Sequence, residues 1–242
     1  MKYKENTQQP QEPFFNVVPL FPSSVIMVNI QGDTSELLNH DGAPVMASAS
    51  SDPTTRVGGN QGDAYYWGTG SEVRVLERFP KTKQILLDAF TFTAENALGY
   101  KKKDYAITTS WLTTSNRGEG SIRHCHKNSF YSCVYYFQEE YPEGTGGIVF
   151  DNPNVDRVAY YFQNSDIEQI NPSNSLSCTF KPEPHLMLVF PSYLNHNVLQ
   201  HGLDTKRKSL AFNVVPLGAY GEHDSSFDYS WVTPSLSSWK SR

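Results

Sequence analysis

Short runs of β-branched and aromatic residues, separated by turns, fill most of the chain from residue 105 to residue 217. The intervening segments, such as 139–147, are rich in turn-forming residues including glycine and proline. We expect strands at 105–114, 124–126, 132–137, 148–150, 158–162, 177–180, 186–190, 195–199 and 208–215. Many short strands at intervals of roughly 8 to 12 residues indicate a sandwich or a barrel. The pattern therefore predicts a mainly β fold, a jelly roll with helices packed outside the sheet.

A single long helix is expected ahead of these strands, over 80–100. Apolar residues recur there at spacings of three and four from Ile85 to Leu98, which gives one face able to cover a sheet. Pro80 suits the first turn and Gly99 suits the end of the helix. We interpret this helix as a structural support for the sheet.

The chain is expected to form one domain behind a flexible tail. The tail covers 1–12 and the domain covers 13–242, divided into N-terminal strands, loops and the supporting helix (13–104), a β core (105–217) and a C-terminal extension (218–242). Two short strands are predicted within 17–30. The loop over 40–75 is either a lid over a site or a simple excursion.

Composition disfavours several classes of protein. A formal net charge of -5 gives no general attraction to phosphate backbones, so nucleic acid is not an expected partner. Three cysteines without a CxxC pair argue against a disulfide framework or a zinc ribbon and suit a reducing compartment. We see neither the apolar core of a signal peptide nor a run of about 18 apolar residues. We expect a soluble, cytoplasmic protein that does not bind membranes and that could form a homo-oligomer.

Two histidines, His124 and His126, lie directly ahead of an aromatic run and are separated by one residue. If the segment is extended, both imidazoles lie on one face and Cys125 on the other, where it would fill the core. His196 follows a later apolar strand and is the natural third ligand of a metal. Three ligands on one face leave open positions, as in facial-triad iron sites. The alternative is three surface or packed histidines without a metal. His185, His201 and His223 are expected to be solvated and not to bind a metal.

A second group of polar residues lies on the strand predicted over 208–215 and just before it. Alternation places Arg207, Ser209 and Asn213 on the same face. An arginine with a serine hydroxyl two residues further on can bind a carboxylate through two parallel bonds and a third. The alternative is that Arg207 is an exposed charge on a strand.

Four segments occur in an order that resembles a known family. They are the HxH of 124–126, SCVYYF at 132–137, FPSYLNHNV at 190–198 and RKSLAFN at 207–213, and GGIVFDNP at 146–153 adds a fifth, weaker match. Together these segments resemble the putative iron(II)- and 2-oxoglutarate-dependent oxygenases, a group related to the prolyl hydroxylases. The resemblance covers about 90 residues.

The resemblance implies a double-stranded β-helix that binds iron(II) at its open end. His124 and His196 match the two metal histidines, and His126 lies where the larger superfamily usually carries Asp or Glu. Asp151 is a less favoured third ligand. Arg207 and Ser209 match the residues that bind the distal carboxylate of 2-oxoglutarate.

The resemblance further implies a hydroxylase that consumes O2 and 2-oxoglutarate and releases succinate and CO2. Tyr136 matches a position whose phenol commonly joins the binding of 2-oxoglutarate, although an ordinary core tyrosine is equally compatible. Trp111 and Asn116 are candidates for the substrate side, with a packed tryptophan as the alternative. The substrate itself, small molecule or peptidyl, is not identified by the sequence.

Two other classes of protein stay open at this point. A cupin-like metal protein could use three histidines for lyase, isomerase or other dioxygenase chemistry, but would give Arg207 and Ser209 no purpose. A jelly-roll binding or structural module could carry a vestigial site.

Overall fold

The computed structural model describes residues 23–41, 43–44, 74–154, 166–171 and 174–228. Its elements are β1 (Ile26–Asn29), η1 (Ser35–Leu37), β2 (Ala43–Pro44), η3 (Val75–Arg78), α2 (Pro80–Asn96), β3 (Tyr105–Ser115), β4 (Tyr131–Tyr135), β5 (Ile148–Asp151), β6 (Ser177–Phe180), β7 (Leu186–Pro191), β8 (His196–Val198), β9 (Arg207–Pro216), β10 (Ala219–Tyr220), η5 (His223–Ser225) and β11 (Phe227–Asp228). The strands predicted within 17–22 and at 158–162, the tail over 1–12 and most of the 40–75 loop fall outside the described residues.

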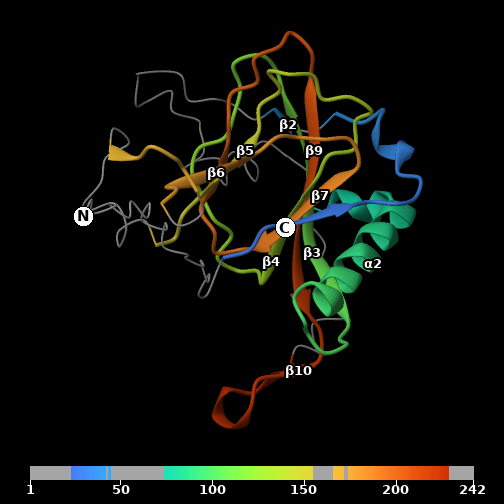
Figure 1. Cartoon of the computed structure of the whole chain (residues 1–242). Helices are drawn as coiled ribbons and strands as arrows, with labels where there is room; N and C mark the ends of the chain where they lie inside the picture. Colours follow the sequence, from blue (N-terminus) through green and yellow to red (C-terminus); the bar gives the residue numbers. More distant parts are fainter. Residues whose placement is uncertain (1–22, 42, 45–73, 155–165, 172–173, 229–242) are drawn as a thin grey trace, which may run out of the picture.

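Two sheets face each other, and the helix covers the outer side of the larger one (Figure 1). The larger sheet has six strands in the order β1-β7-β4-β9-β3-β2, antiparallel except for the pair β2–β3. The smaller sheet has the order β6-β5-β8 and is antiparallel. This arrangement is the double-stranded β-helix that we predicted.

Strand β9 shows how alternation builds the layers. Leu210, Phe212 and Val214 are buried in the core between the large sheet and α2. Burial of each such side chain contributes roughly 1.5–3 kcal/mol. The alternate residues of β9, among them Arg207 and Ser209, point toward the smaller sheet, where a second apolar core lies. One face of this strand therefore stabilises the fold while the other is available for a site.

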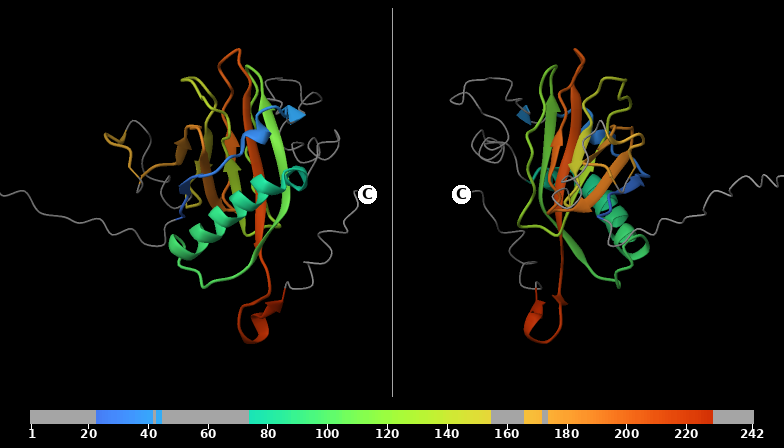
Figure 2. Two further views of the ribbon diagram at one scale, coloured as in Figure 1. Left: turned by 90° about the vertical axis from the view of Figure 1, so that its right-hand side faces the viewer. Right: turned by 60° about the vertical axis from the view of Figure 1, so that its left-hand side comes forward.

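The predicted helix is confirmed in place and in role. Leu86, Phe90 and Ala94 are fully buried against the large sheet, across which α2 runs in Figure 2. The helix starts at Pro80, whose missing N–H costs nothing in the first turn. Gly99 takes a φ of +70°, the left-handed conformation that glycine adopts most easily just beyond a helix end.

The strand predicted at 124–126 is wrong. His124 forms only an isolated antiparallel bridge with His196, and the chain turns again at 127–128. Away from this bridge, the N–H of Ser121 donates to the carbonyl of Val198 on β8 at 3.0 Å, whereas the N–H of His126 donates to Ser192, outside β8. The side chains of His124 and His126 nevertheless point to the same side, as the predicted alternation required.

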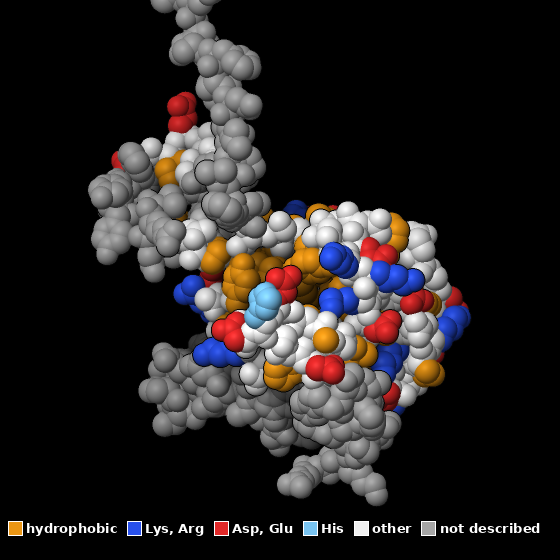
Figure 3. Space-filling model, turned by 90° about the horizontal axis from the view of Figure 1, so that it is seen from below, with side chains coloured by type: hydrophobic (Ala, Val, Ile, Leu, Met, Phe, Trp, Pro, Cys, Tyr) orange, Lys and Arg blue, Asp and Glu red, His pale blue; other side chains and the backbone are white. Residues whose placement is uncertain are grey.

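The hairpin β10–β11 extends from the end of β9 below the sheets in Figure 1. The Tyr220 ring packs edge-on against Phe130, with ring centroids 5.3 Å apart. Viewed from below, this side of the molecule exposes hydrophobic side chains next to Lys and Arg side chains (Figure 3). No helix in the described part of the chain combines the length and apolar character needed to cross a membrane.

Candidate metal centre

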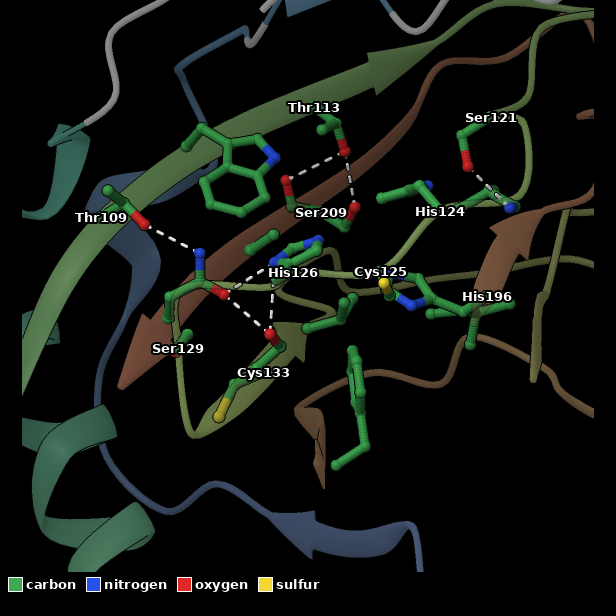
Figure 4. A pocket seen from close by; sticks show the side chains of 18 of the residues that line it. Thr109, Thr113, Ser121, His124, Cys125, His126, Ser129, Cys133, His196 and Ser209 are labelled. Atoms are coloured by element: carbon green, nitrogen blue, oxygen red, sulfur yellow. Dashed lines mark hydrogen bonds between the residues drawn. The ribbon is translucent and has the colours of Figure 1, made fainter. Parts of the chain in front are cut away.

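Three histidines meet between the two sheets, at one wall of a cavity of about 530 Å³ (Figure 4). The potential ligand atoms of His124, His126 and His196 all lie within 4.8 Å of one another. Main-chain hydrogen bonds fix two of these residues: the N–H of His124 donates to the carbonyl of His196 and the reverse bond has the same length, 2.9 Å. His126 is fixed separately, through its N–H, to the carbonyl of Ser192 at 2.9 Å.

The hydrogen bonds of the imidazoles determine which nitrogen is free. Nδ1 of His124 lies 2.8 Å from the carbonyl of Ile122, and Nδ1 of His196 lies 2.9 Å from the carbonyl of Leu194. Because a carbonyl oxygen can only accept, each Nδ1 carries a proton, and in the neutral imidazole the lone pair is then on Nε2.

His126 is oriented by a side chain instead of by the main chain. Its Nδ1 lies 2.7 Å from Oδ1 of Asn213, and the Asn213 amide in turn donates to Thr109 Oγ1 at 2.9 Å. Ser132 Oγ also donates to this Asn213 oxygen, at 2.7 Å. All three rings are therefore held by a hydrogen-bond partner at Nδ1, the arrangement found around protein-bound metals.

Burial keeps the deepest ligand neutral. His196 is 4% exposed, and burial lowers its pKa to about 3, with the nearby His124 contributing in the same direction. A neutral imidazole is the form that binds a metal ion.

Asp151 lies apart from the histidine cluster. Its carboxylate forms an ion pair with Arg123, and the cluster of potential ligands among the described residues contains no carboxylate. The donor set is therefore three uncharged nitrogens, which iron(II) and other divalent transition metals accept.

Arg207 lines the same cavity but is buried, and it has no acidic partner among the residues that the structure describes. The residue is only 2% exposed, so its interpretation as an exposed strand charge is wrong. Its Nε donates to the carbonyl of Gly146 at 2.8 Å and one terminal nitrogen donates to Ser209 Oγ at 3.3 Å. No described carboxylate pairs with the guanidinium. An unpaired buried charge is strongly destabilising, so the site is suited to an anionic ligand.

Two further hydroxyls lie close to Arg207. Thr113 Oγ1 is 2.7 Å from Ser209 Oγ, because β3 and β9 pair these residues directly. The Arg207 guanidinium carbon lies 5.4 Å from the ring centroid of Tyr136, whose buried hydroxyl has no hydrogen-bond partner among the described residues. A carboxylate beside Arg207 would meet the cation and serine that we predicted.

The remaining candidate site residues differ in whether they line the cavity. Trp111 lines the cavity, with its ring centroid 5.5 Å from that of His126. Asn116 is exposed and bonds to Glu119 within a turn, and it is absent from the described lining of the cavity. Tyr136 belongs to the core between the sheets and is likewise absent from that lining.

Two minor expectations are wrong. Cys125 is half-buried and lines the cavity instead of filling the core, since the segment is not a regular strand. His201 is buried, not solvated, and its Nε2 donates to the carbonyl of Thr205 at 2.6 Å. His185 and His223 are exposed, as expected.

Sequence reasoning missed Thr113 and the role of Asn213. Thr113 reaches Ser209 only through the register of β3 on β9, which the sequence does not state. Asn213 could have been found, because alternation puts it on the inward face with Arg207 and Ser209.

Comparison with known proteins gives one family match. Residues 109–213 match the family model described as "Putative 2OG-Fe(II) oxygenase", which confirms the resemblance stated from the motifs. This family uses iron(II), 2-oxoglutarate and O2. No curated protein matches the chain.

Among solved structures, similarity is low. A 2OG-Fe(II) oxygenase family oxidoreductase from Burkholderia pseudomallei is 15% identical, with 51% of this chain and 50% of that chain covered and a TM-score of 0.36. A Pseudomonas putida prolyl-4-hydroxylase is 18% identical over 57% and 60% of the two chains, with a TM-score of 0.33. The α-ketoglutarate-dependent epimerase SnoN from nogalamycin biosynthesis is 11% identical over 83% and 79%, with a TM-score of 0.49. The matches to the first two structures span half to three fifths of their length.

Proposed function

We propose, from the match of residues 109–213 to the model of the putative 2OG-Fe(II) oxygenases, that the protein hydroxylates a C–H bond of its substrate. The reaction couples this oxidation to the decarboxylation of 2-oxoglutarate, so that O2 is consumed and succinate and CO2 are released. One oxygen atom enters the substrate and the other enters succinate.

In this proposal Nε2 of His124, His126 and His196 hold the iron. Their Nδ1 hydrogen bonds fix the rings, and the potential ligand atoms of the three residues lie within 4.8 Å of one another. Iron(II) bound there would supply the activation of O2 that no amino-acid side chain provides. The contribution of the chain is to offer three ligands only, which leaves positions open for the cosubstrate and O2.

Arg207 and Ser209 would bind the distal carboxylate of 2-oxoglutarate. The guanidinium keeps one terminal nitrogen without a described partner, and the serine hydroxyl lies within 3.3 Å of the other. Apolar side chains of Val134, Ile148 and Phe190 line the same cavity and limit the access of water. Orientation and a dry cavity are therefore the main protein contributions.

One observation carries the proposal: a buried arginine that pairs with no acidic residue in the described part of the chain shares one cavity with three histidines whose potential ligand atoms lie within 4.8 Å of one another. A cupin-like metal protein would need the histidines but not the arginine. A structural jelly roll would need neither, and an unpaired buried cation would only destabilise it.

Anaerobic titration of the iron(II)-loaded protein with 2-oxoglutarate tests the proposal. We expect a weak visible charge-transfer band in the wild type, loss of bound iron in His124→Ala and His196→Ala, and retention of iron without the band in Arg207→Met. The exposed His223→Ala is the matched control and should behave as wild type. An iron-loaded wild type without the band would overturn the proposal.

The type of reaction is tested with a panel of metabolites and peptides. Succinate formation identifies a substrate, and mass spectrometry after turnover under ¹⁸O2 then reads the product. Hydroxylation adds one labelled oxygen to the product. A product with no added oxygen would contradict hydroxylation and leave another 2-oxoglutarate-dependent oxidation.

A further inference from the structure

The cavity is strongly biased toward positive charge. Two cationic side chains line it, Arg207 deep inside and Lys127 at the surface, whereas none of the described residues that line it is Asp or Glu. The neutral part of the lining consists of histidines, small polar residues and apolar residues. A cavity of this kind attracts anions through its local electrostatic potential.

The metal site adds to this bias, an argument that rests on the proposed function. The three histidines are uncharged ligands, so the two positive charges of a bound iron(II) are not reduced by the protein. The two negative charges of 2-oxoglutarate offset the charge of the metal, and Arg207 and Lys127 then stay as an excess. A substrate that enters the loaded cavity therefore meets a net positive field.

Lys127 is well placed to meet that substrate. It is exposed, lines the cavity and follows His126 directly, so the two Cα atoms are about 3.8 Å apart. It has no ion-pair partner in the described part of the chain. Other cations do: Arg123 pairs with Asp151, and Lys208 with Asp41 at 2.7 Å.

The residues around Lys127 suit a small organic anion. Asn128 follows it along the cavity wall and offers a side-chain amide as a hydrogen-bond donor. Trp111 packs next to His126, with ring centroids 5.5 Å apart, and provides a flat apolar surface in the cavity lining. These groups can hold a charged end and a carbon skeleton at the same time.

We propose that the prime substrate carries a negatively charged group, a carboxylate or a phosphate, which binds Lys127 at the mouth of the cavity. The oxidised carbon then lies a few bonds from that anion, between Trp111 and the histidines. Free acids and acidic groups on a peptide share this chemistry, and neutral and cationic compounds are disfavoured.

Small probe ions test the proposal without knowledge of the substrate. The protein is loaded with cobalt(II) and saturating 2-oxoglutarate, and the methyl-proton relaxation of three probes is measured against a zinc-loaded sample. The probes are methanesulfonate, which is an anion and a poor metal ligand, the neutral dimethyl sulfone, and the cation tetramethylammonium. Cobalt enhances relaxation only for probes that enter the cavity.

We expect relaxation of methanesulfonate to be enhanced at least several-fold more than that of the two other probes. Lys127→Gln should remove this preference and Lys127→Glu should shift it toward tetramethylammonium. Lys102→Glu makes the same charge change at an exposed lysine outside the described cavity lining, and should leave the preference as in the wild type. Equal enhancement of the three probes, or a preference unchanged in Lys127→Glu, would overturn the proposal.

The two proposals fail in different ways. If iron-loaded protein shows no charge-transfer band with 2-oxoglutarate, the proposed function fails and this inference fails with it. If the band is present but the anion is not preferred, only the inference about the substrate is wrong.

Discussion

The side-chain oxygen of Asn213 lies 2.7 Å from Nδ1 of His126, so that an amide on β9 sets the tautomer of a potential metal ligand located before β4. The other two histidines of the cluster use main-chain carbonyls for the same purpose. His126 is thus the ligand whose orientation depends on a replaceable side chain.

Asn213→Leu should weaken metal binding, because it removes the acceptor for His126 while it keeps the shape of the side chain. We expect a loss of about 10- to 100-fold in affinity for cobalt(II), measured by competition with a chelator. Asn213→Asp keeps an acceptor and should bind cobalt(II) at least as tightly as the wild type. Asn116→Leu, at an exposed amide, is the control. An unchanged affinity in a folded Asn213→Leu protein would show that the bond has no orienting role.

Arg207→Met should abolish tight binding of 2-oxoglutarate and leave metal binding intact. Loss of one partner from a buried charge pair costs about 2–5 kcal/mol, which corresponds to roughly 30- to 4,000-fold in affinity. Binding is measured by calorimetry on the cobalt-loaded protein, and Lys206→Met, at the adjacent exposed lysine, serves as control. A 2-oxoglutarate affinity within threefold of the wild-type value would contradict this role.

Tyr136→Phe and Tyr135→Phe should affect different properties. The hydroxyl of Tyr135 lies 2.7 Å from Thr34 Oγ1 in a buried hydrogen bond, and its loss should lower the free energy of unfolding by about 0.5–1.5 kcal/mol. The Tyr136 hydroxyl has no such described partner, so Tyr136→Phe should not destabilise the apo protein.

The same pair of variants tests whether Tyr136 contacts the cosubstrate. If its hydroxyl binds 2-oxoglutarate together with Arg207, Tyr136→Phe weakens 2-oxoglutarate binding and Tyr135→Phe does not. Urea unfolding measures the change in the free energy of unfolding, and calorimetry measures the change in 2-oxoglutarate affinity. Equal 2-oxoglutarate affinities in both variants would assign Tyr136 to the core alone.

The stability of the metal-free protein should fall as the pH is lowered from about 6.5 to about 3. Burial lowers the pKa of His196 to about 3 in the folded state, whereas an unfolded histidine titrates near 6.5. Within this window the unfolded chain binds a proton that the folded protein does not, so each pH unit costs about 1.4 kcal/mol. His196→Asn lacks this group and should show a shallower pH dependence in urea unfolding. Parallel curves for the two proteins would rule out this origin.

Much of the large sheet follows from local sequence patterns. Alternation on β9 separates Leu210 and Phe212 from Arg207 and Ser209, and apolar spacing defines α2, because both depend on residues near in sequence. The motifs also group the three histidines with Arg207, and in the structure all four line one cavity. Their positions relative to one another depend on strand pairing.

The features that were missed all depend on contacts between distant segments. The pairing of Thr113 with Ser209 needs the register between two strands, and the bond from Asn213 to His126 needs the path of a turn. The backbone at 124–126 is irregular, with only an isolated bridge from His124 to His196, and a propensity for β structure does not reveal this. The burial of Arg207 likewise arises from the segment at Gly146, 61 residues away in sequence.

The reciprocal main-chain bonds between His124 and His196 make these two ligands a mechanically coupled pair. A backbone shift at one of them is transmitted to the other, so neither can be repositioned alone by mutation of its neighbours. His126 lies outside this bridge and is anchored to other elements. Efforts to engineer the charge or geometry of the centre should therefore start at His126, for example with His126→Asp. Replacement of this residue leaves the main-chain bonds between His124 and His196 in place.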